Sequence, residues 1–480
     1  MDHLVELHGD RLMVTEPATG RTLTYREASG LVTEWSSAVA ARISPDDRVV
    51  VGLAGYDQFL MCLAIARAGG VPVPLNPQMR PAERDHVCHD ARPGLVIESL
   101  ADVSGGGGTA PPLEAPVSAT PDDIAALFYT SGTTGSPKGA ELTHRSLVGQ
   151  LGPVALVPDV LHSGEGLAAL PVAHIMGFIT YLGLALAGIP LVCFERFRAG
   201  EVLDQIETRG ISLFVGVPSM YRMLLEAGAA DHDLRSIRVW LSGADVMPPE
   251  LIHAFKRMGG TVKVPGLGPI GEATFIEGYG MVEVGGAVAI KVSPPGPSFG
   301  AEALGFRVPG YRLRVVDDAG RARRLGQIGE LWLKGPGVLR GYWDAPEATA
   351  AVLDTDGWLH TGDLVQVGPF GTIIFKGRSK LVLKSGGFSV YPREVEAVLE
   401  QHPDVLEASV VGRPDPTLGE VPVAAVRLAP GSAATPRELI AFAGERLSSY
   451  KAPRRVIVVD ELPRTGTDKV QAAEVRQLFE

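Results

Sequence analysis

Short apolar runs alternate with amphipathic stretches over most of the chain. Residues 47–55 form an apolar run that ends in glycine, residues 56–70 follow with helical apolar spacing, and residues 71–76 form a second apolar run. This alternation predicts a strand–helix–strand unit and favours a parallel sheet with flanking helices. Further strands are predicted at 124–129, 213–217, 238–241 and 315–316.

The pattern changes after about residue 380. The spacing there predicts helices at 393–401 and 436–447, and strands at 405–411 and 421–428. About 100 residues of this mixed kind can fold as a separate domain. We therefore expect an α/β protein with a large N-terminal domain, residues 1–379, in which parallel-rich sheets are flanked by helices, and a small α+β C-terminal domain, residues 380–480.

One stretch approaches the length of a membrane span. Residues 177–194 contain 18 residues without a charge, close to the length that a spanning helix requires. Gly188 and Pro190 lie inside this stretch and are typical of a turn. No second such stretch exists, so we expect a buried helix followed by a strand, and no membrane span.

Composition and charge narrow the class of protein. The 58 glycines and 37 prolines follow no repeat, and 45% of the residues are hydrophobic, which excludes collagen-like and disordered chains. A net charge of −11 argues against a nucleic-acid or anionic-membrane binder. The three cysteines, Cys62, Cys88 and Cys193, are scattered, which argues against a disulfide framework. With no secretory signal visible at the start, a cytoplasmic location is expected.

The strongest local signal is the sequence YTSGTTGSPKG at 129–139. It follows a predicted strand, and the residues from Leu142 onward are predicted to be helical. Its glycines allow close approach of the backbone, and its hydroxyls and Lys138 would supply the donors and the cation that a polyphosphate requires. The spacing is not that of a Walker A loop.

This motif resembles the phosphate loop of the adenylate-forming (ANL) superfamily, which includes acyl-CoA synthetases, peptide-synthetase adenylation domains and beetle luciferases. Other segments resemble that family's motifs in the same order along nearly the whole chain. They are GGVPVPLNP at 69–77, GYGMVE at 278–283, GEL at 329–331, TGD at 361–363, GRSK at 377–380, YKAPRRV at 450–456 and PRTGTDK at 463–469.

The resemblance implies a set of nucleotide-binding residues. Asp363 would accept hydrogen bonds from the ribose hydroxyls, and Arg378 would contact ribose or phosphate. Glu283 would bind magnesium together with Thr130. Residues of the phosphate loop would hold the β- and γ-phosphates: Thr130, Ser131, Gly132, Thr133, Thr134, Gly135 and Lys138. Tyr279 would stack on adenine, and the residues around it would complete the adenine site: Gly243, Ala244, Gly278, Gly280, Met281 and Val282.

The resemblance also implies catalytic and acceptor-binding residues. Lys469 would bridge the carboxylate and the α-phosphate, and Lys380 would be the hinge of a mobile C-terminal domain. Gly386 and Gly387 would line a tunnel for coenzyme A, although a glycine pair in a tight turn is the alternative.

His174 matches the family's segment beside the acyl pocket, although a core histidine is the alternative interpretation. The apolar residues near it would line that pocket: Met176, Phe178, Tyr181 and Val217. These segments contain no arginine, so a dicarboxylic acid is not expected.

Three departures from the family bear on the adenylation step. Val282 stands where the family usually has a threonine, so one hydroxyl is lost. Asp468 stands where the family usually has glycine, beside Lys469. Residues 264–274 resemble an insertion, which we expect to lie at the edge of the adenine site and to reshape or obstruct ATP entry.

The leading interpretation is an acyl-CoA ligase that uses ATP, magnesium and coenzyme A on an apolar acid, whether aryl, medium-chain or polycyclic. A second is a weakly adenylating enzyme that forms the thioester from a preformed acyl-adenylate (acyl-AMP) made by a partner. A third is a stand-alone enzyme that loads a separate carrier protein; a luciferase and a decayed binding protein are less favoured. The composition also resembles that of acyl-CoA ligases of actinobacterial natural-product pathways, including those acting on terpenoid acids. Either a monomer or a homodimer is expected.

Overall fold

The computed structural model describes the chain except for residues 78, 105–112, 131–136, 150, 152–163, 265–267, 298–302 and 465–469. The described residues form two compact units. The first takes the described residues up to Arg312 together with Lys334–Gly357. The second takes Leu313–Leu333 and Trp358–Glu480.

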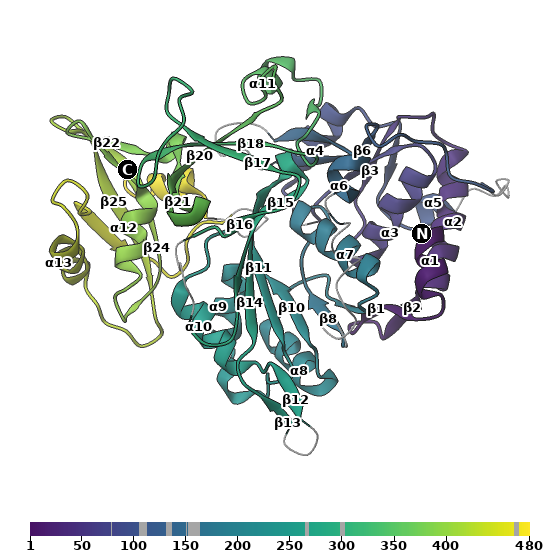
Figure 1. Ribbon diagram of the computed structural model, residues 1–480, viewed down its shortest axis with the longest axis horizontal. Helices are drawn as coiled ribbons and strands as arrows, with labels where there is room; N and C mark the ends of the chain where they lie inside the picture. Colours follow the sequence, from purple (N-terminus) through teal and green to yellow (C-terminus); the bar gives the residue numbers. More distant parts are fainter. Residues whose placement is uncertain are drawn as a thin grey trace. The chain divides into compact units, whose positions relative to one another are not determined.

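A nine-stranded sheet dominates the first unit, with the order β16-β15-β14-β11-β10-β8-β9-β1-β2 (Figure 1). Its central pairs, from β14 across to β1, are parallel, whereas the pairs at both edges are antiparallel. The strands are β1 Leu12–Glu16, β2 Arg21–Thr24, β8 Gly166–Ala168, β9 Leu191–Cys193, β10 Leu213–Gly216, β11 Val239–Gly243, β14 Thr274–Met281, β15 Gly286–Ser293 and β16 Phe306–Arg307.

Three smaller sheets complete the strands of this unit. One is parallel and contains β3 Arg48–Val51, β4 Val71–Pro74 and β5 Leu95–Ile97. The second, in the order β19-β7-β6, is antiparallel and contains β6 Ile124–Thr130, β7 Lys138–Thr143 and β19 Gly341–Tyr342. The third is the hairpin of β12 Val262–Val264 and β13 Gly268–Ile270.

Helices connect most of these strands. They are α1 Asp2–His8, α2 Tyr25–Ala40, α3 Gly55–Arg67, α4 Pro81–Ala91, α5 Ala101–Ser104, α6 His144–Val148, α7 Ile175–Ala187, α8 Ala199–Arg209, α9 Pro218–Glu226, α10 Pro249–Met258 and α11 Pro346–Ala350, with the 3₁₀ turns η3 Ala229–Asp231 and η4 Val282–Val284. Among the described residues, no helix is long and apolar enough to cross a membrane. The uncharged stretch instead forms α7, a turn at Gly188 in the left-handed region, and β9, as predicted.

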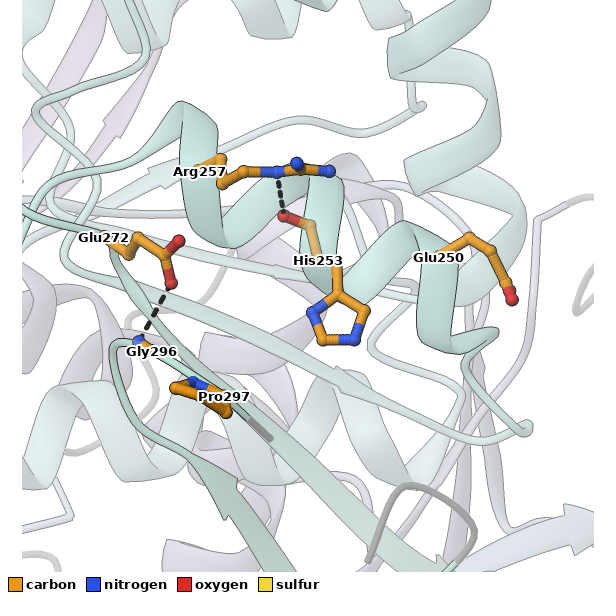
Figure 2. Close-up of a pocket in the computed structure, with 6 residues that line it drawn as sticks. All are labelled: Glu250, His253, Arg257, Glu272, Gly296 and Pro297. Atoms are coloured by element: carbon orange, nitrogen blue, oxygen red, sulfur yellow. Dashed lines mark hydrogen bonds between the residues drawn. The ribbon is translucent and has the colours of Figure 1, made fainter. Parts of the chain in front are cut away.

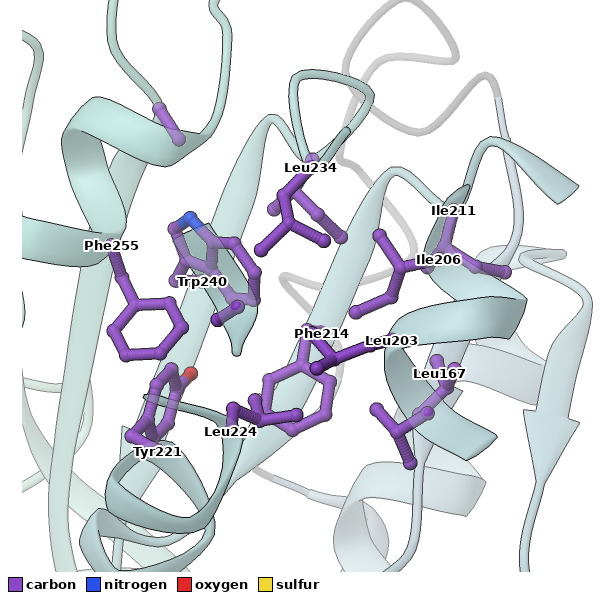
Figure 3. Close-up of a cluster of buried hydrophobic side chains, with 14 of the residues drawn as sticks. Leu167, Leu203, Ile206, Ile211, Phe214, Tyr221, Leu224, Leu234, Trp240 and Phe255 are labelled. Atoms are coloured by element: carbon purple, nitrogen blue, oxygen red, sulfur yellow. The ribbon is translucent and has the colours of Figure 1, made fainter. Parts of the chain in front are cut away.

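One face of the large sheet packs against α8, α9 and α10 through an aromatic cluster (Figure 3). The ring of Trp240 on β11 lies 5.0 Å from that of Phe255 on α10, edge to face, and Tyr221 on α9 lies 4.9 Å from Phe255. Such edge-to-face pairs add to the free energy of area burial. Because side chains alternate along a strand, Gly243 lies on the opposite face from Trp240, which is the face that carries α7.

The second unit contains two sheets. The four-stranded sheet has the order β17-β18-β20-β21, and the other combines β23-β22-β25-β24 with β26 on β25. The strands are β17 Arg312–Val316, β18 Ile328–Lys334, β20 Leu359–Val367, β21 Ile373–Arg378, β22 Leu383–Ser385, β23 Phe388–Val390, β24 Val405–Asp415, β25 Gly419–Leu428 and β26 Arg455–Val458. The helices are α12 Pro392–Leu399, α13 Pro436–Arg446 and α14 Ala472–Gln477, with 3₁₀ turns η5 Pro369–Gly371 and η6 Ser379–Leu381.

The predicted α/β class is confirmed, and the predicted strands and most of the predicted helices form. One local prediction is wrong. The residues from Leu142 onward were expected to be helical, but β7 continues to Thr143 and the helix begins only at His144. The Thr143 side chain caps that helix by accepting a hydrogen bond from Ser146 N at 3.1 Å, so the strand ends where the cap begins. The predicted domain boundary between residues 379 and 380 stays a prediction.

We predict that Phe255→Ala lowers the free energy of unfolding of the first unit by about 3–5 kcal/mol, because it leaves a cavity among fully buried rings. Chemical denaturation followed by tryptophan fluorescence measures this change, since Trp240 lies in the same cluster. As a control, Leu7→Ala removes an exposed side chain and should cost less than about 0.5 kcal/mol. Equal costs for the two variants would contradict the assignment of this cluster as the core.

Candidate active site

The phosphate-loop motif lies in a β-hairpin. Thr130 at the end of β6 pairs with Lys138 at the start of β7. The loop that joins them carries Ser131, Gly132, Thr133, Thr134 and Gly135, which lie outside the described residues. The pairing therefore fixes both flanks of the motif, with Lys138 exposed and Thr130 half-buried.

Helix α4 holds the two flanks of this hairpin. The Tyr129 hydroxyl donates a hydrogen bond to Asp90 Oδ2 at 2.7 Å, and the His86 ring nitrogen Nε2 lies 2.9 Å from the carbonyl oxygen of Pro137. Burial, followed by the hydrogen bond to Asp90, raises the pKa of Tyr129 above its usual value. The phenol therefore stays protonated and donates throughout the ordinary pH range.

Glu283 lies in the η4 turn, directly after β14. Its Oε1 accepts a hydrogen bond from the Tyr342 hydroxyl at 2.9 Å, and its backbone oxygen accepts one from Leu339 N at 2.8 Å. The ring of Tyr342 faces Lys138, whose Nζ lies 5.6 Å from the ring centroid. One tyrosine thus contacts both the candidate metal ligand and the candidate phosphate-binding lysine.

The donor set fits magnesium held mainly by a nucleotide. Among the described residues, no group of three or more His, Cys, Asp or Glu side chains is arranged to hold a metal ion. Magnesium is commonly bound through one or two carboxylates plus substrate phosphates, so it does not need a cage made only of protein groups. The Glu283 carboxylate and the Thr130 hydroxyl are oxygen donors of the required kind.

The predicted adenine-site residues lie at the ends of two adjacent parallel strands. Gly243 on β11 pairs with Gly278 on β14, and Ala244 follows in the left-handed region with φ of 68°. Non-glycine residues adopt this region at a cost that is commonly found at functional sites. A β-bulge lies between Tyr279 and Gly280, and a Cβ on Gly280 would collide with the backbone of β15.

The bulge leads directly into the turn that carries Glu283. Met281 ends β14, and Val282 opens the η4 turn. Just before the predicted adenine residues, Glu277 pairs with Lys291 at 2.6 Å. Burial raises the pKa of Glu277, and the Lys291 ammonium opposes that shift.

The predicted acyl-pocket residues fall into two groups. Phe178 and Tyr181 are buried in the core, where Phe178 packs edge to face on Phe128 and the Tyr181 hydroxyl donates to the Leu170 oxygen at 2.9 Å. Met176 and Val217 are half-buried. The Met176 sulfur lies 3.4 Å from the point where a Cβ on Gly243 would stand, so it borders the candidate adenine site.

His174 caps the N-terminus of α7. Its Nδ1 accepts a hydrogen bond from Met176 N at 3.2 Å, so the neutral ring carries its proton on Nε2. The half-buried ring thereby caps the first turn of α7, which begins at Ile175. This geometry supplies a structural reason for a histidine here and leaves its chemical role a prediction.

The second unit carries the two residues predicted to contact ribose. Asp363 on β20 is directly opposite Arg378 on β21, and Arg378 Nε lies 3.0 Å from Asp363 Oδ1. Asp363 is 1% exposed, whereas the Arg378 side chain is 45% exposed. The turn before Asp363 is held by Glu330 Oε1, which accepts a hydrogen bond from Gly362 N at 2.9 Å. The predicted hinge residue, Lys380, is exposed in η6.

Gly386 and Gly387 form the two-residue turn between β22 and β23. Their φ values of 56° and 84° are both positive, which is the combination that a type I′ hairpin turn requires. The geometry of the turn alone therefore explains the glycine pair. That these glycines line a tunnel for coenzyme A stays a prediction. Lys469 and Asp468 lie outside the described residues.

The expected position of the 264–274 insertion is wrong. The segment forms the β12–β13 hairpin and then enters β14 at Thr274, which pairs with the first residue of β11. Tyr279 lies five residues further along the strand, or about 17 Å away at ordinary strand rise. Figure 1 shows the hairpin at the end of the large sheet where β14 begins, opposite the end where β14 reaches Tyr279. The insertion is close to the adenine motif in sequence but not in space.

A surface pocket lies beside this hairpin and not at the candidate site (Figure 2). Its lining residues are Glu250, His253, Arg257, Glu272, Gly296 and Pro297. Buried Lys256 donates to the Gly296 oxygen at 2.6 Å, and Glu272 Oε2 accepts from Gly296 N at 3.0 Å. These bonds tie α10, the end of the insertion and the residues after β15 together.

Four residues at the site were missed by sequence reasoning: His86, Asp90, Glu330 and Tyr342. Glu330 belongs to the GEL motif, which relates it to the family but does not predict that it holds the turn before Asp363. Tyr342 is 59 residues from Glu283 along the chain, and no local pattern connects them.

Comparison with known proteins defines the class. A model of the AMP-binding enzyme family matches residues 1–343, and a model of the AMP-binding enzyme C-terminal domain matches residues 394–469. The chain is 34% identical to feruloyl-CoA synthase of an Amycolatopsis species, over 96% of this chain and 94% of that protein. It is 32% identical to the fatty acid–[acyl-carrier-protein] ligase ScoC of Streptomyces coeruleorubidus, over 97% and 94%.

A solved structure resembles it over nearly the whole chain. ATP-bound MatB from Rhodopseudomonas palustris has a TM-score of 0.84 at 28% identity, covering 98% of this chain and 96% of that one. The chain therefore belongs to the AMP-binding enzyme family of adenylate-forming proteins. Within that class it is a member of the acyl-CoA ligase branch, an AMP-forming acid–thiol ligase.

We predict that replacing residues 263–269 by a short Gly-Asn-Gly turn changes the KM for ATP by less than about two-fold, because sites this far apart act independently. Initial-rate kinetics at varied ATP measure this. The control Tyr279→Ala should raise that KM about ten-fold or more if the ring stacks on adenine. A hairpin variant as impaired as the control would restore the idea that the insertion borders the nucleotide.

Proposed function

We propose that the protein activates an apolar carboxylic acid, most readily an aryl acid, with ATP and transfers the acyl group to coenzyme A. The carboxylate oxygen attacks the α-phosphorus and pyrophosphate leaves, which gives an acyl-adenylate. The thiol sulfur then attacks the acyl carbonyl, AMP leaves, and the thiol proton passes to solvent. The observation that carries this proposal is the contact of Tyr342 with both Lys138 and Glu283.

The first unit would hold the triphosphate and the purine. Lys138, Thr130 and the loop between them would neutralise the β- and γ-phosphates, so that pyrophosphate leaves more easily. Glu283 would hold magnesium, which lowers the cost of negative charge on the departing phosphates. Tyr279 would stack on adenine beside Gly243 and Ala244.

The second unit would hold the ribose and complete the chemistry. Asp363 would accept hydrogen bonds from ribose hydroxyls, with Arg378 paired to that buried carboxylate and contacting ribose or phosphate itself. Lys469 would bridge the carboxylate and the α-phosphate during adenylation. Movement at Lys380 would then replace Lys469 by the Gly386–Gly387 turn, beside which the pantetheine arm enters.

The class of acid is inferred from small and apolar groups on the α7 face of the sheet. A Cβ on Gly278 would lie 3.7 Å from the Ala287 side chain, and Met176 borders Gly243. Because Gly243 and Gly278 are assigned to the adenine site, the group on this face that is left for the acid is the Met176 thioether, which adapts to the edge of a flat ring. The relative named feruloyl-CoA synthase supports an aryl acid. The relative ScoC, named as an acyl-carrier-protein ligase, supports a carrier-protein thiol as the alternative acceptor.

A second candidate function is thioester formation mainly from a preformed acyl-adenylate. The observation that favours it is Val282, which opens the turn that carries Glu283 and has no hydroxyl to offer a phosphate. The loss of one hydrogen bond is worth about 1 kcal/mol or more. The insertion no longer supports this alternative, because it lies at the other end of the sheet.

The test of the proposed function is an acid screen. Purified protein with MgATP, coenzyme A and a panel of aryl, medium-chain and polycyclic acids should release AMP, pyrophosphate and a CoA thioester in equal amounts, with aryl acids preferred. Mass spectrometry identifies the thioester, and a carrier-protein thiol is offered in parallel. Release of phosphate in place of pyrophosphate, or no thioester with any acid or acceptor, would contradict the proposal.

The Val282→Thr variant separates the two candidates. If valine weakens adenylation, restoring the hydroxyl should raise acid-dependent ATP–pyrophosphate exchange about five-fold or more, with little change in thioester formation from a synthetic acyl-adenylate. Val284→Thr, in the same turn, serves as the control substitution. Ordinary exchange by the wild type, unchanged in Val282→Thr, would eliminate the second candidate.

A further inference from the structure

A short segment, Leu339–Trp343, connects the candidate metal ligand to the phosphate-loop hairpin. At one end, Leu339 N donates to the Glu283 oxygen at 2.8 Å. At the other end, Trp343 N donates to the Gly139 oxygen at 2.8 Å. Between them, β19 pairs with β7, so Tyr342 lies opposite Ala140. This 339–343 segment is therefore anchored in both places by backbone hydrogen bonds.

The hydroxyl and the ring of Tyr342 contact two different charged side chains. Its hydroxyl donates to Glu283 Oε1 at 2.9 Å, and its ring faces the Lys138 ammonium at 5.6 Å. The backbone of Tyr342 is fixed in turn by the Thr349 hydroxyl, which accepts from Tyr342 N at 2.8 Å. The backbone from which this side chain projects is therefore fixed relative to β7 and α11.

A single neutral donor orients a carboxylate without neutralising it. The phenol occupies one acceptor position of Glu283 and leaves the remaining lone pairs of the carboxylate for a cation. Partners that hydrogen-bond to a metal-binding carboxylate typically alter metal affinity about 10–100-fold. The ring face contributes a smaller attraction for Lys138 that does not depend on the metal.

From this geometry we infer that Tyr342 is a positioning residue, which orients Glu283 toward magnesium through its hydroxyl and holds Lys138 through its ring. The inference rests on the proposed function, in which Glu283 binds magnesium and Lys138 binds phosphate. It assigns the two effects to separate parts of one side chain. Substitutions that remove those parts one at a time can therefore separate them.

The experiment measures the affinity for α,β-methylene-ATP by titration calorimetry, once with magnesium and once with EDTA. The ratio of the two dissociation constants is the metal-dependent gain. Tyr342→Phe removes only the hydroxyl and should reduce this gain about ten-fold, leaving the affinity in EDTA unchanged. Tyr342→Leu removes the ring as well and should also weaken binding in EDTA about two- to five-fold.

Two controls distinguish positioning from a general structural effect. Tyr311→Phe removes a phenol that donates to the Val284 oxygen at 3.0 Å, in the same turn, and should keep the full gain. Glu283→Gln should abolish most of the gain. The double variant Glu283→Gln with Tyr342→Phe should lose no more than Glu283→Gln alone, since the hydroxyl acts only through that carboxylate.

The possible results distinguish a failure of this inference from a failure of the proposed function. A wild-type protein with a normal gain and a Tyr342→Phe variant within about two-fold of it would overturn the inference and leave the proposed function intact. The inference also fails if the two losses multiply in the double variant, or if Tyr311→Phe loses as much of the gain as Tyr342→Phe. A wild type that gains nothing from magnesium would overturn the inference and the proposed metal role together.

Discussion

The antiparallel pairing of β6 with β7 is the constraint on which the candidate site depends. It places Thr130 opposite Lys138, so both flanks of the phosphate loop leave the sheet at one point. Helix α4 holds the hairpin through Asp90 and His86, and β19 extends it on the other edge. The residues just before β19 then reach Glu283 through a backbone hydrogen bond. Without this pairing, the cation and the carboxylate would have no fixed relation.

The overall charge gives this local arrangement its importance. A chain with a net charge of −11 does not attract ATP or coenzyme A through its long-range field. Capture has to rest on cations held at defined points, and the structure restrains two candidates. Lys138 faces Tyr342, and Arg378 lies against buried Asp363. A cation restrained before the nucleotide arrives loses less conformational entropy on binding.

Much of the fold could be predicted because strand and helix periods are local properties. The strand–helix–strand unit at β3, α3 and β4 formed as expected, as did α12 and α13. The helix expected from Leu142 was misplaced because an apolar run shorter than about six residues fits either period. The insertion was misplaced for another reason: the strand that follows it is eight residues long and carries the adenine motif to its far end.

The candidate site could be predicted only where a motif marks it. The motifs mark Glu283, Asp363 and the phosphate hairpin as candidates, and these assignments stay predictions. They give no information about the residues that hold these groups in place. Tyr342, Asp90 and Glu330 act through contacts between distant parts of the chain, which no local pattern reveals. At the glycine pair 386–387 a motif is present, but the positive φ values of the turn already account for glycine there, so the motif is not evidence of a binding role.

In the function that we propose, the triphosphate and its metal meet between the β6–β7 hairpin and Glu283. The most direct measurement is anomalous diffraction from crystals grown with Mn²⁺ and α,β-methylene-ATP. We expect one manganese peak within coordination distance of the Glu283 carboxylate, with the β- and γ-phosphates against Lys138. A nucleotide bound away from the hairpin, or a manganese peak remote from Glu283, would contradict the account.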